Sequence, residues 1–365
     1  MSKKTFVSII FIIISLCLIS CSGESQESQE VSANEDLPNL IIQVEGDAHI
    51  RRTGWSDFLP LAFGATVKPG DLIRVENGSL VIFCGAEDTL DDGPITLEAS
   101  DQEQGIPCKT GLPPRPWEDV AHIRGAGDLD IPYIISPRNT ALLSTTPTLR
   151  WNPVPGSDSY SVSIMDELGK PRPEIESSET EIDWPSEWQP LAQDSTYILQ
   201  VKTGSVRSMD QNTAGTGFWL LPSPEANQVA QHADRIRSLT IDESTTNFLI
   251  AKLYGNHGLY AEAVQLLEQT AAQRQEASIW LELSKAYLEM GLSDQAEETL
   301  EKALDLSQEK GQTDIEANAL LGMGYTAQKS GDEAMAIDYW QQASTVFKEI
   351  GDMQSLALVN ELLEK

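Results

Sequence analysis

Few side chains in this sequence have the types and the spacing that catalysis or ligand chemistry requires. The sequence contains no Gly-x-Ser-x-Gly elbow, no His-Glu-x-x-His pair and no phosphate-binding glycine loop. Its histidines are scattered over different segments of the chain: His49, His122, His232 and His257. We therefore expect a protein that is not an enzyme and that needs no cofactor.

The cysteines are the next residues with reactive side chains. Cys84 and Cys108 flank an acidic segment that also contains proline and glycine. In an oxidising compartment we expect this pair to form a disulfide, which would stabilise the fold by roughly 3 to 4 kcal/mol in the chain-entropy model. Two unpaired structural thiols are the alternative. A metal site is not expected, because neither cysteine has a partner at ligand spacing.

A cluster of carboxylates lies between these two cysteines: Glu87, Asp88, Asp91 and Asp92. Such a cluster could hold calcium, but it lacks the Asp-x-Asn/Asp-x-Asp-Gly order of a known calcium loop. We expect a solvated loop here and no metal.

The other two cysteines, Cys17 and Cys21, lie at the end of an apolar N-terminal segment. Lys3 and Lys4 precede about 14 mostly apolar residues, a length too short to span a bilayer as a helix but typical of a secretory signal peptide. The stretch Leu18-Ile19-Ser20-Cys21 resembles the lipobox of bacterial lipoproteins, in which the signal is cut before the cysteine and the cysteine is then acylated.

This resemblance implies that residues 1–20 are a signal peptide and that Cys21 is lipidated. Two or three acyl chains would hold the protein stably on a bacterial membrane. The expected location is extracytoplasmic, either periplasmic or on the cell surface. A plain secretory cleavage site and an uncleaved anchor are the alternatives.

The net charge limits the partners of the chain. The sequence has 25 Lys and Arg against 56 Asp and Glu, a net charge of -31, and loss of Lys3 and Lys4 with the signal would make it -33. Such a surface repels phosphate backbones and anionic headgroups. We therefore expect no nucleic acid partner, and contact with the membrane through the lipid anchor only. Residues 21–37 are acidic and polar, which predicts a disordered tether.

Residues 38–100 are predicted to form a small antiparallel β domain. Apolar residues alternate from Leu40 to Ile50, as on one face of a single strand, and Asn77-Gly78 predicts a hairpin between two apolar runs. The stretch "GDAHIRR...GATVKPGDLIRVENGSLVIFC" resembles the extracytoplasmic domain of FecR-type regulators, although no internal membrane span or cytoplasmic arm accompanies it. Residues 101–130 are predicted to be an irregular linker.

Residues 131–222 show a second β pattern. Trp151 falls in one predicted strand, and Tyr160, Val162 and Ile164 alternate in the next. Tyr197 follows Leu191 by six residues and begins another strand. These features resemble the core tryptophan and the tyrosine corner of a fibronectin type III β-sandwich, which implies a fold and no particular ligand.

Residues 224–365 are helical and repetitive. One motif has a regular set of large and small residues: Trp280, Leu283, Tyr287, Gly291, Ala296, Leu300 and Ala303. The pattern resembles the tetratricopeptide repeat, and it fits the segments on both sides. The alanines Ala263, Ala296 and Ala336 are 33 and 40 residues apart, so the last repeat is longer than usual. The resemblance implies an all-α solenoid of about three repeats with a capping helix at each end.

In this family the first helix of each pair lines an inner groove. The matching positions are Phe248, Lys252, Leu281, Lys285, Leu288, Leu321, Tyr325 and Gln328. Lys252 and Lys285 stand in register, which suggests binding of an acidic or C-terminal carboxylate group of an extended peptide. The alternative is that they are ordinary helix lysines paired with Glu282 or Glu289.

The predicted order of domains is similar to that of a class of bacterial envelope proteins. Our leading hypothesis is a non-catalytic, membrane-anchored adaptor that binds a partner protein or peptide through the repeat groove. The alternative is an envelope sensor or a module that binds cell-wall glycan through the FecR-like domain, with the repeats as a spacer.

Overall fold

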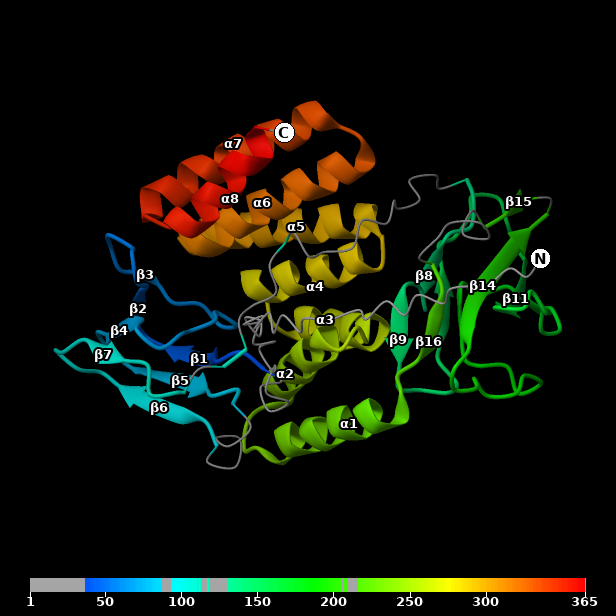
Figure 1. Ribbon diagram of the computed structural model, residues 1–365, viewed down its shortest axis with the longest axis horizontal. Coiled ribbons are helices and arrows are strands. Elements are labelled where there is room, and N and C mark those ends of the chain that lie inside the picture. The colour runs from blue at the N-terminus through cyan, green and yellow to red at the C-terminus, as the bar shows by residue number, and fades with distance from the viewer. Residues whose placement is uncertain are drawn as a thin grey trace, which may run out of the picture. The chain divides into compact units, whose positions relative to one another are not determined.

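The computed structural model describes residues 37–86, 93–109, 111–112, 117, 130–204, 206–208 and 216–364 (Figure 1). The predicted signal peptide, Cys21, almost all of the tether, the acidic cluster from Glu87 to Asp92, His122 and most of the predicted linker lie outside the described residues. Within the described part of the chain, none of the helices combines the length and the apolar character needed to cross a bilayer.

The first β region contains two small antiparallel sheets. One has the order β1-β5-β6, with β1 at Leu40–Glu45, β5 at Ser79–Phe83 and β6 at Ile95–Glu98. The other has the order β3-β2-β4-β7, with β3 at Leu59–Pro60, β2 at Ala48–Arg51, β4 at Leu72–Val75 and β7 at Gln104–Gly105. Apolar side chains of both sheets share one core, as the fully buried Ile41, Ile73 and Leu80 show.

Two predictions for this region are wrong. Leu40 to Ile50 is not one strand, and Asn77-Gly78 does not close a hairpin, because β4 and β5 belong to different sheets. The chain passes between the sheets at Gly46-Asp47 and again at Asn77-Gly78. The two crossings contact each other: Asp47 N donates to Asn77 Oδ1 over 3.2 Å. Gly46 has a φ of +79°, which an extended strand cannot continue through.

A disulfide connects the ends of the two sheets. Cys84 follows β5 and Cys108 follows β7, and their Cα atoms are 5.3 Å apart. Both cysteines are buried. The bond therefore adds a covalent link between the two sheets.

The second β region also contains two sheets. The larger has the order β12-β11-β14-β16-β9, with β15 on the side of β14, and the smaller has the order β13-β10-β8. Their bounds are β8 Ile134–Ser136, β9 Thr140–Leu142, β10 Leu149–Trp151, β11 Tyr160–Asp166, β12 Ile175–Ser177, β13 Glu181–Ile182, β14 Thr196–Thr203, β15 Val206–Arg207 and β16 Phe218–Leu220. The pair β9 and β16 is parallel, and the other pairs are antiparallel.

The aromatic residues selected from the sequence lie in the core of this second region. Trp151 is 1% exposed, and its ring centroid lies 5.7 Å from that of Tyr160. Tyr197 is buried as well, and its hydroxyl accepts a hydrogen bond from Ala192 N over 3.0 Å. Trp151 belongs to the smaller sheet and Tyr160 to the larger, so their contact packs one sheet against the other. The bond from Ala192 supplies the polar partner that a buried tyrosine hydroxyl needs. The closer likeness to a fibronectin type III sandwich stays a prediction.

Eight helices follow in the described residues. Their bounds are α1 Ser223–Ser238, α2 Glu243–Asn256, α3 Tyr260–Gln273, α4 Ala277–Glu289, α5 Ser293–Glu309, α6 Thr313–Ser330, α7 Glu333–Ile350 and α8 Met353–Leu363. Consecutive helices pack as the pairs α2/α3, α4/α5 and α6/α7, with α1 and α8 at the ends (Figure 1). Aspartates cap several N-termini; Asp332, for example, accepts a bond from Met335 N over 2.9 Å.

The helix lengths explain the irregular repeat period. Ala263, Ala296 and Ala336 are all buried where the paired helices approach each other. The interval from Ala263 to Ala296 runs through α3 and α4, which have 14 and 13 residues. The interval from Ala296 to Ala336 runs through α5 and α6, which have 17 and 18 residues. The 40-residue interval therefore comes from longer helices.

Candidate partner-binding groove

The predicted groove residues come from α2, α4 and α6, the first helix of each pair. Phe248, Leu288 and Leu321 are fully buried, and Leu281 and Tyr325 nearly so. The two lysines are partly covered, and only Gln328 is exposed. Aromatic residues from the N-terminal part of the chain contact this surface at two places, which we call the Phe63 seat and the Trp117 seat.

The Phe63 seat consists of Phe248, Arg274 and Ser278. Phe63 follows β3 and is 3% exposed, and its ring centroid lies 5.0 Å from that of Phe248. The guanidinium carbon of Arg274 lies 4.0 Å from the centroid of the same ring. Ser278 Oγ donates a hydrogen bond to the carbonyl oxygen of Phe63 over 2.5 Å. The seat thus binds an aromatic ring and the backbone beside it.

Gly64, the next residue, allows the backbone to come this close. It has a φ of +77°, and a Cβ placed on it would lie 2.7 Å from Ser278 Oγ and 2.9 Å from Phe248 Cζ. Any side chain here would be strained by the backbone angle and would collide with α2 and α4. Glycine at position 64 therefore allows the backbone beside Phe63 to lie this close to α2 and α4.

The Trp117 seat consists of Lys285, Gly322 and Tyr325. Trp117 is 4% exposed and stacks on Tyr325 with a centroid distance of 6.4 Å and an interplanar angle of 18°. Lys285 Nζ lies 5.2 Å from the Trp117 ring. A Cβ on Gly322 would come within 2.6 Å of Trp117 Cη2. The absence of a side chain at this glycine in α6 leaves the space that the indole fills.

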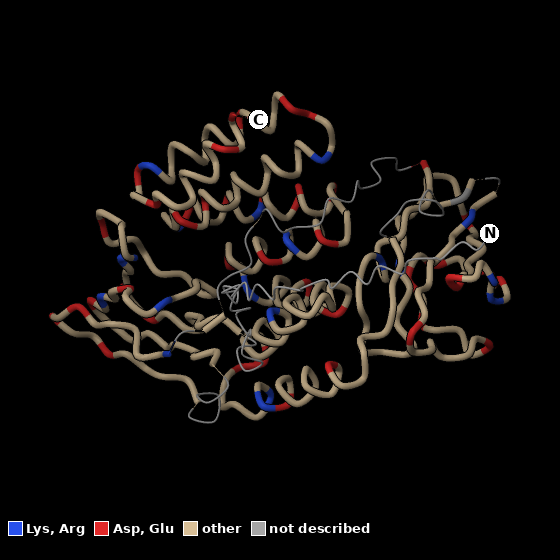
Figure 2. The backbone as a smooth tube through the Cα atoms, in the orientation of Figure 1, with Lys and Arg blue, Asp and Glu red and all other residues tan. Residues whose placement is uncertain are grey.

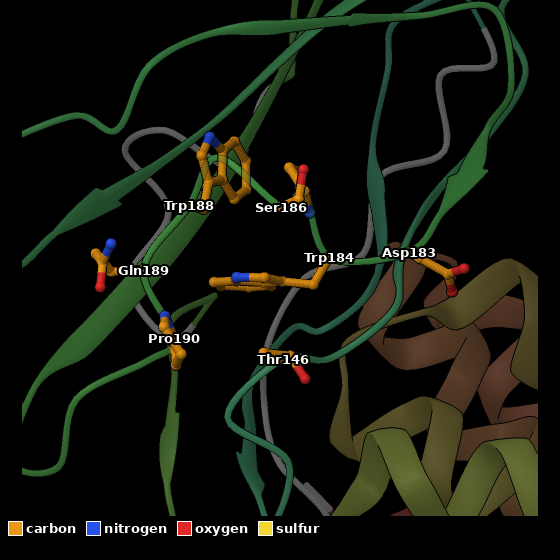
Figure 3. Close-up of a pocket in the computed structure, with 8 residues that line it drawn as sticks. Thr146, Asp183, Trp184, Ser186, Trp188, Gln189 and Pro190 are labelled. Carbon is orange, nitrogen blue, oxygen red and sulfur yellow. The ribbon is translucent and has the colours of Figure 1, made fainter.

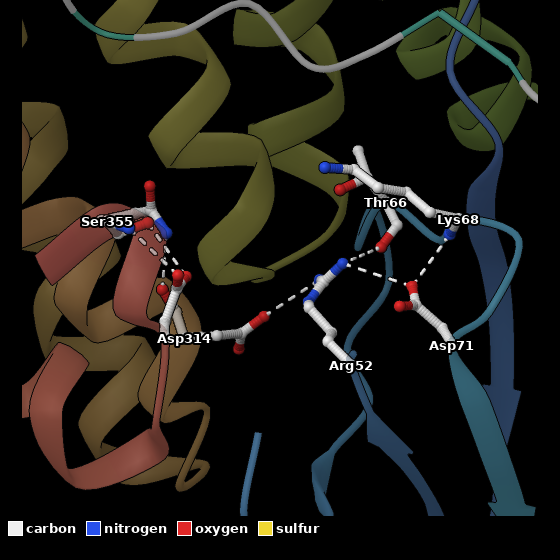
Figure 4. A network of polar contacts seen from close by, with 8 residues as sticks. Arg52, Thr66, Lys68, Asp71, Asp314 and Ser355 are labelled. Carbon is white, nitrogen blue, oxygen red and sulfur yellow. Dashed lines mark hydrogen bonds and ion pairs between the residues drawn. The ribbon is translucent and has the colours of Figure 1, made fainter. Parts of the chain in front are cut away.

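A polar network joins the same β region to α6 (Figure 4). Arg52 Nη1 donates to Thr66 O over 2.9 Å and lies 3.6 Å from a carboxylate oxygen of Asp71. Arg52 Nη2 lies 3.6 Å from Asp314 Oδ2 in the first turn of α6. Burial raises the pKa of Asp314, although Arg52 opposes this effect. The arginine therefore links the loop that carries Phe63 to the third helix pair.

The two lysines selected from the sequence share an acidic partner within the chain. Lys252 Nζ lies 2.7 Å and Lys285 Nζ 3.2 Å from the carboxylate oxygens of Glu282. Burial disfavours the charged form of Glu282, but the two ammonium groups outweigh it and lower the pKa of Glu282 to about 2. These contacts match the interpretation in which the lysines pair with Glu282 of the same chain.

The acidic character of the chain extends over this part of the molecule. Residues 224–365 contain 24 acidic and 10 basic residues. Figure 2 shows acidic residues distributed along the helices and in both β regions instead of being gathered at one place. Among the described residues, no group of three or more His, Cys, Asp or Glu side chains has a geometry that could hold a metal ion.

The second β region contacts the helices through polar groups. Arg138, 1% exposed, donates from Nε to Met290 O over 2.7 Å, and Asn139 Nδ2 donates to Glu289 O over 2.6 Å. Both carbonyls belong to the last turn of α4 and its end, where backbone oxygens lack helical partners.

A bidentate ion pair adds to these contacts. Arg150 donates from Nη1 and Nη2 to the two carboxylate oxygens of Glu268, over 2.9 and 3.2 Å. Tyr287 Oη donates to the same carboxylate over 2.6 Å. Burial together with the charge of Glu268 raises the pKa of Tyr287, so this phenol stays protonated and continues to donate. Glu268 is therefore the shared acceptor between the second β region and the helices α3 and α4.

The second β region also contains a pocket of about 600 Å³ (Figure 3). Trp184 lies in it, with the edge-on ring of Trp188 at a centroid distance of 5.4 Å and the guanidinium of Arg172 at 5.1 Å. The lining residues are Thr146, Asp183, Trp184, Pro185, Ser186, Trp188, Gln189 and Pro190. The residues of this pocket form no known motif, so it could not be predicted from the sequence.

Comparison with known proteins identifies the helical part. No curated protein sequence matches the chain. The crystal structure of MamA shares 16% identity, covers 40% of this chain and 92% of its own, and has a TM-score of 0.28. BtubC from P. vanneervenii shares 16% identity, covers 39% and 71% of the two chains, and has a TM-score of 0.29. Residues 275–349, which span α4 to α7, match the family model of the tetratricopeptide repeat, and this part of the chain is a tetratricopeptide repeat region.

Proposed function

We propose that this protein is a non-catalytic scaffold that binds a partner protein through its helical repeats and is held outside the cytoplasm by a lipid on Cys21. The observation that carries the proposal is the stack of helix pairs, of which α4/α5 and α6/α7 match the tetratricopeptide repeat. Stacked repeats bury a continuous core and present an extended surface, and this surface is what such proteins use for binding.

The contacts with Phe63 and Trp117 restrict where a partner can first bind. Among the predicted groove residues Gln328, near the end of α6, is exposed. In the proposal, the partner makes its first contact at this end of α6. The partner can contact the deeper groove residues only after Phe63 or Trp117 leaves its seat.

Site-specific photocrosslinking tests this function. A benzophenone amino acid replaces Gln328 in the mature chain, and the matched positions are Asp57 in the first β region and Leu168, 87% exposed, in the second. After incubation with envelope extract, we expect a protein adduct from the position in α6 and none from the other two. An adduct from position 57 alone would favour the sensor or glycan-binding alternative. An adduct from position 168 alone, or no adduct, would contradict both.

The proposed anchor has its own test. Replacement of Cys21 by serine removes the thiol that would be acylated, so the chain should lose label from a radioactive fatty acid. Label that persists with serine at this position would contradict lipidation of Cys21.

A further inference from the structure

We infer that the inner surface of the repeats is a binding site for a phenylalanine-glycine turn, that Phe63 and Gly64 are its built-in ligand, and that an external partner binds by presenting the same kind of turn. This inference rests on the proposed function and adds the chemistry of the partner. The lysine hypothesis is not needed for it, since Lys252 and Lys285 already pair with Glu282.

The Phe63 seat recognises several features of its ligand at once. Phe248 packs on the ring, Arg274 lies over it and Ser278 donates to the adjacent carbonyl. A ring held by an aromatic neighbour and a cation gains more than its buried area alone would give. The hydrogen bond from Ser278 then sets the direction of the backbone.

The seat also selects the residue that follows the phenylalanine in the chain. Because a Cβ at Gly64 would meet both Ser278 Oγ and Phe248 Cζ, the groove excludes turns with any larger residue at that place. The seat therefore discriminates between an aromatic residue followed by glycine and the same aromatic residue in an ordinary strand or helix.

Phe63 and the residues of its seat lie far apart in the chain. Phe63 belongs to the first β region, whereas Phe248 and Ser278 belong to α2 and α4. All contacts between Phe63 and the seat are non-covalent, so the same turn on another molecule would make the same contacts. Competition between the two would regulate the scaffold.

A labelled cyclic peptide of residues 59–67, Leu-Pro-Leu-Ala-Phe-Gly-Ala-Thr-Val, is the probe for this site. Its fluorescence anisotropy is measured with the full mature chain, in wild-type form and with Phe63→Ala. We expect at least tenfold tighter binding to Phe63→Ala, in which the seat has lost its own ring. A peptide with alanine in place of the phenylalanine should show no such preference. Equal affinity of the probe for both chains would overturn the inference.

A second pair of variants opens the seat without removing Phe63. Gly64→Ala places a Cβ against α2 and α4, whereas Gly54→Ala has a similar backbone strain at a φ of +94° but no atom within 4 Å. We expect the probe to bind Gly64→Ala at least tenfold more tightly than Gly54→Ala. Equal binding by these two chains would overturn the inference even if Phe63→Ala did not fold.

The outcome is separable from that of the proposed function. An adduct at Gln328 without any gain in probe binding would keep the scaffold and reject the phenylalanine-glycine site. Probe binding as expected, with no adduct from envelope extract, would keep the site and reject the scaffold as proposed.

Discussion

The two β regions contact the same helices but by different chemistry. Phe63 of the first region, together with Trp117 farther along the chain, packs between buried groups of the inner helices, and these two rings are almost fully covered. The second region donates hydrogen bonds from Arg138, Asn139 and Arg150 to helix ends and to a carboxylate. At the two seats the first contact depends mainly on ring shape and burial, with polar support from Ser278 and from the ion pair of Arg52 with Asp314. The second contact depends mainly on charge and hydrogen bonds. Substitutions and salt should therefore separate them.

The largest effect is expected for Phe63→Ala. Loss of a buried phenylalanine ring costs about 3 to 5 kcal/mol, so the contact between the first β region and α2 and α4 should open. Faster amide hydrogen exchange in both helices would show this. The control is Phe58→Ala, because the Phe58 ring lies under Arg51 and Arg74 within its own region. Equal exchange in the two variants would mean that the ring in the groove adds no stability.

The next effect concerns Glu282, which lies between Lys252 and Lys285. Its folded pKa of about 2 is below the ordinary value of 4.5, so its contribution to stability is complete above pH 4.5 and is lost as the pH falls through 2. We expect Glu282→Gln to lower the free energy of unfolding by about 3 kcal/mol at pH 7, because it leaves two cations without an anion. Denaturant titrations from pH 7 to pH 2 should show this difference shrinking. A difference independent of pH would contradict the ion pair.

A smaller effect is expected for the second β region. Glu268→Gln removes the charge that Arg150 and Tyr287 share and should cost about 2 kcal/mol. Glu181→Gln is the control, since Glu181 also pairs with Arg150, at 3.3 Å, but is largely exposed. Its loss should cost less than about 0.5 kcal/mol. High salt should weaken the contact through Glu268 and leave the Phe63 seat intact. If both contacts responded equally to salt, the proposed contrast would be incorrect.

The smallest effect compares two glycines within helices. Gly255→Ala in α2 meets no atom within 4 Å, so helix propensity should raise stability by about 1 kcal/mol. Gly322→Ala in α6 gains the same propensity but collides with Trp117, and it should bring no net gain. Thermal unfolding of the two variants measures the difference. Equal gains would show that Trp117 does not occupy its seat in solution.

The helices were the most predictable part of the molecule. Their signals are local: buried small residues such as Ala296 recur with the repeat, and aspartates such as Asp332 mark helix starts. The strands of the first region were harder, because the alternation from Leu40 to Ile50 continues across Gly46, where the chain changes sheets. Hydrophobic alternation reports which face is buried but not which strand is the neighbour.

Only the helical half of the candidate site could be predicted from the sequence. The repeat pattern located the inner helices, and Phe248, Lys285 and Tyr325 contact aromatic rings of the same chain there. It gave no sign that these rings belong to Phe63 and Trp117, which are far away in the sequence and lie in no recognisable motif. Contacts between distant segments depend on the three-dimensional arrangement, and one sequence shows no pairing between them.

The disulfide makes the two inserted rings act as a pair. Only eight residues lie between Cys108 and Trp117, and the nine steps from one to the other reach about 30 Å when fully extended. An indole that leaves its seat while Phe63 is still bound is therefore confined near the groove, at an effective concentration in the millimolar range. A competitor with a single aromatic residue would have to exceed that concentration, whereas a bivalent competitor that replaces both rings could succeed at a much lower dose.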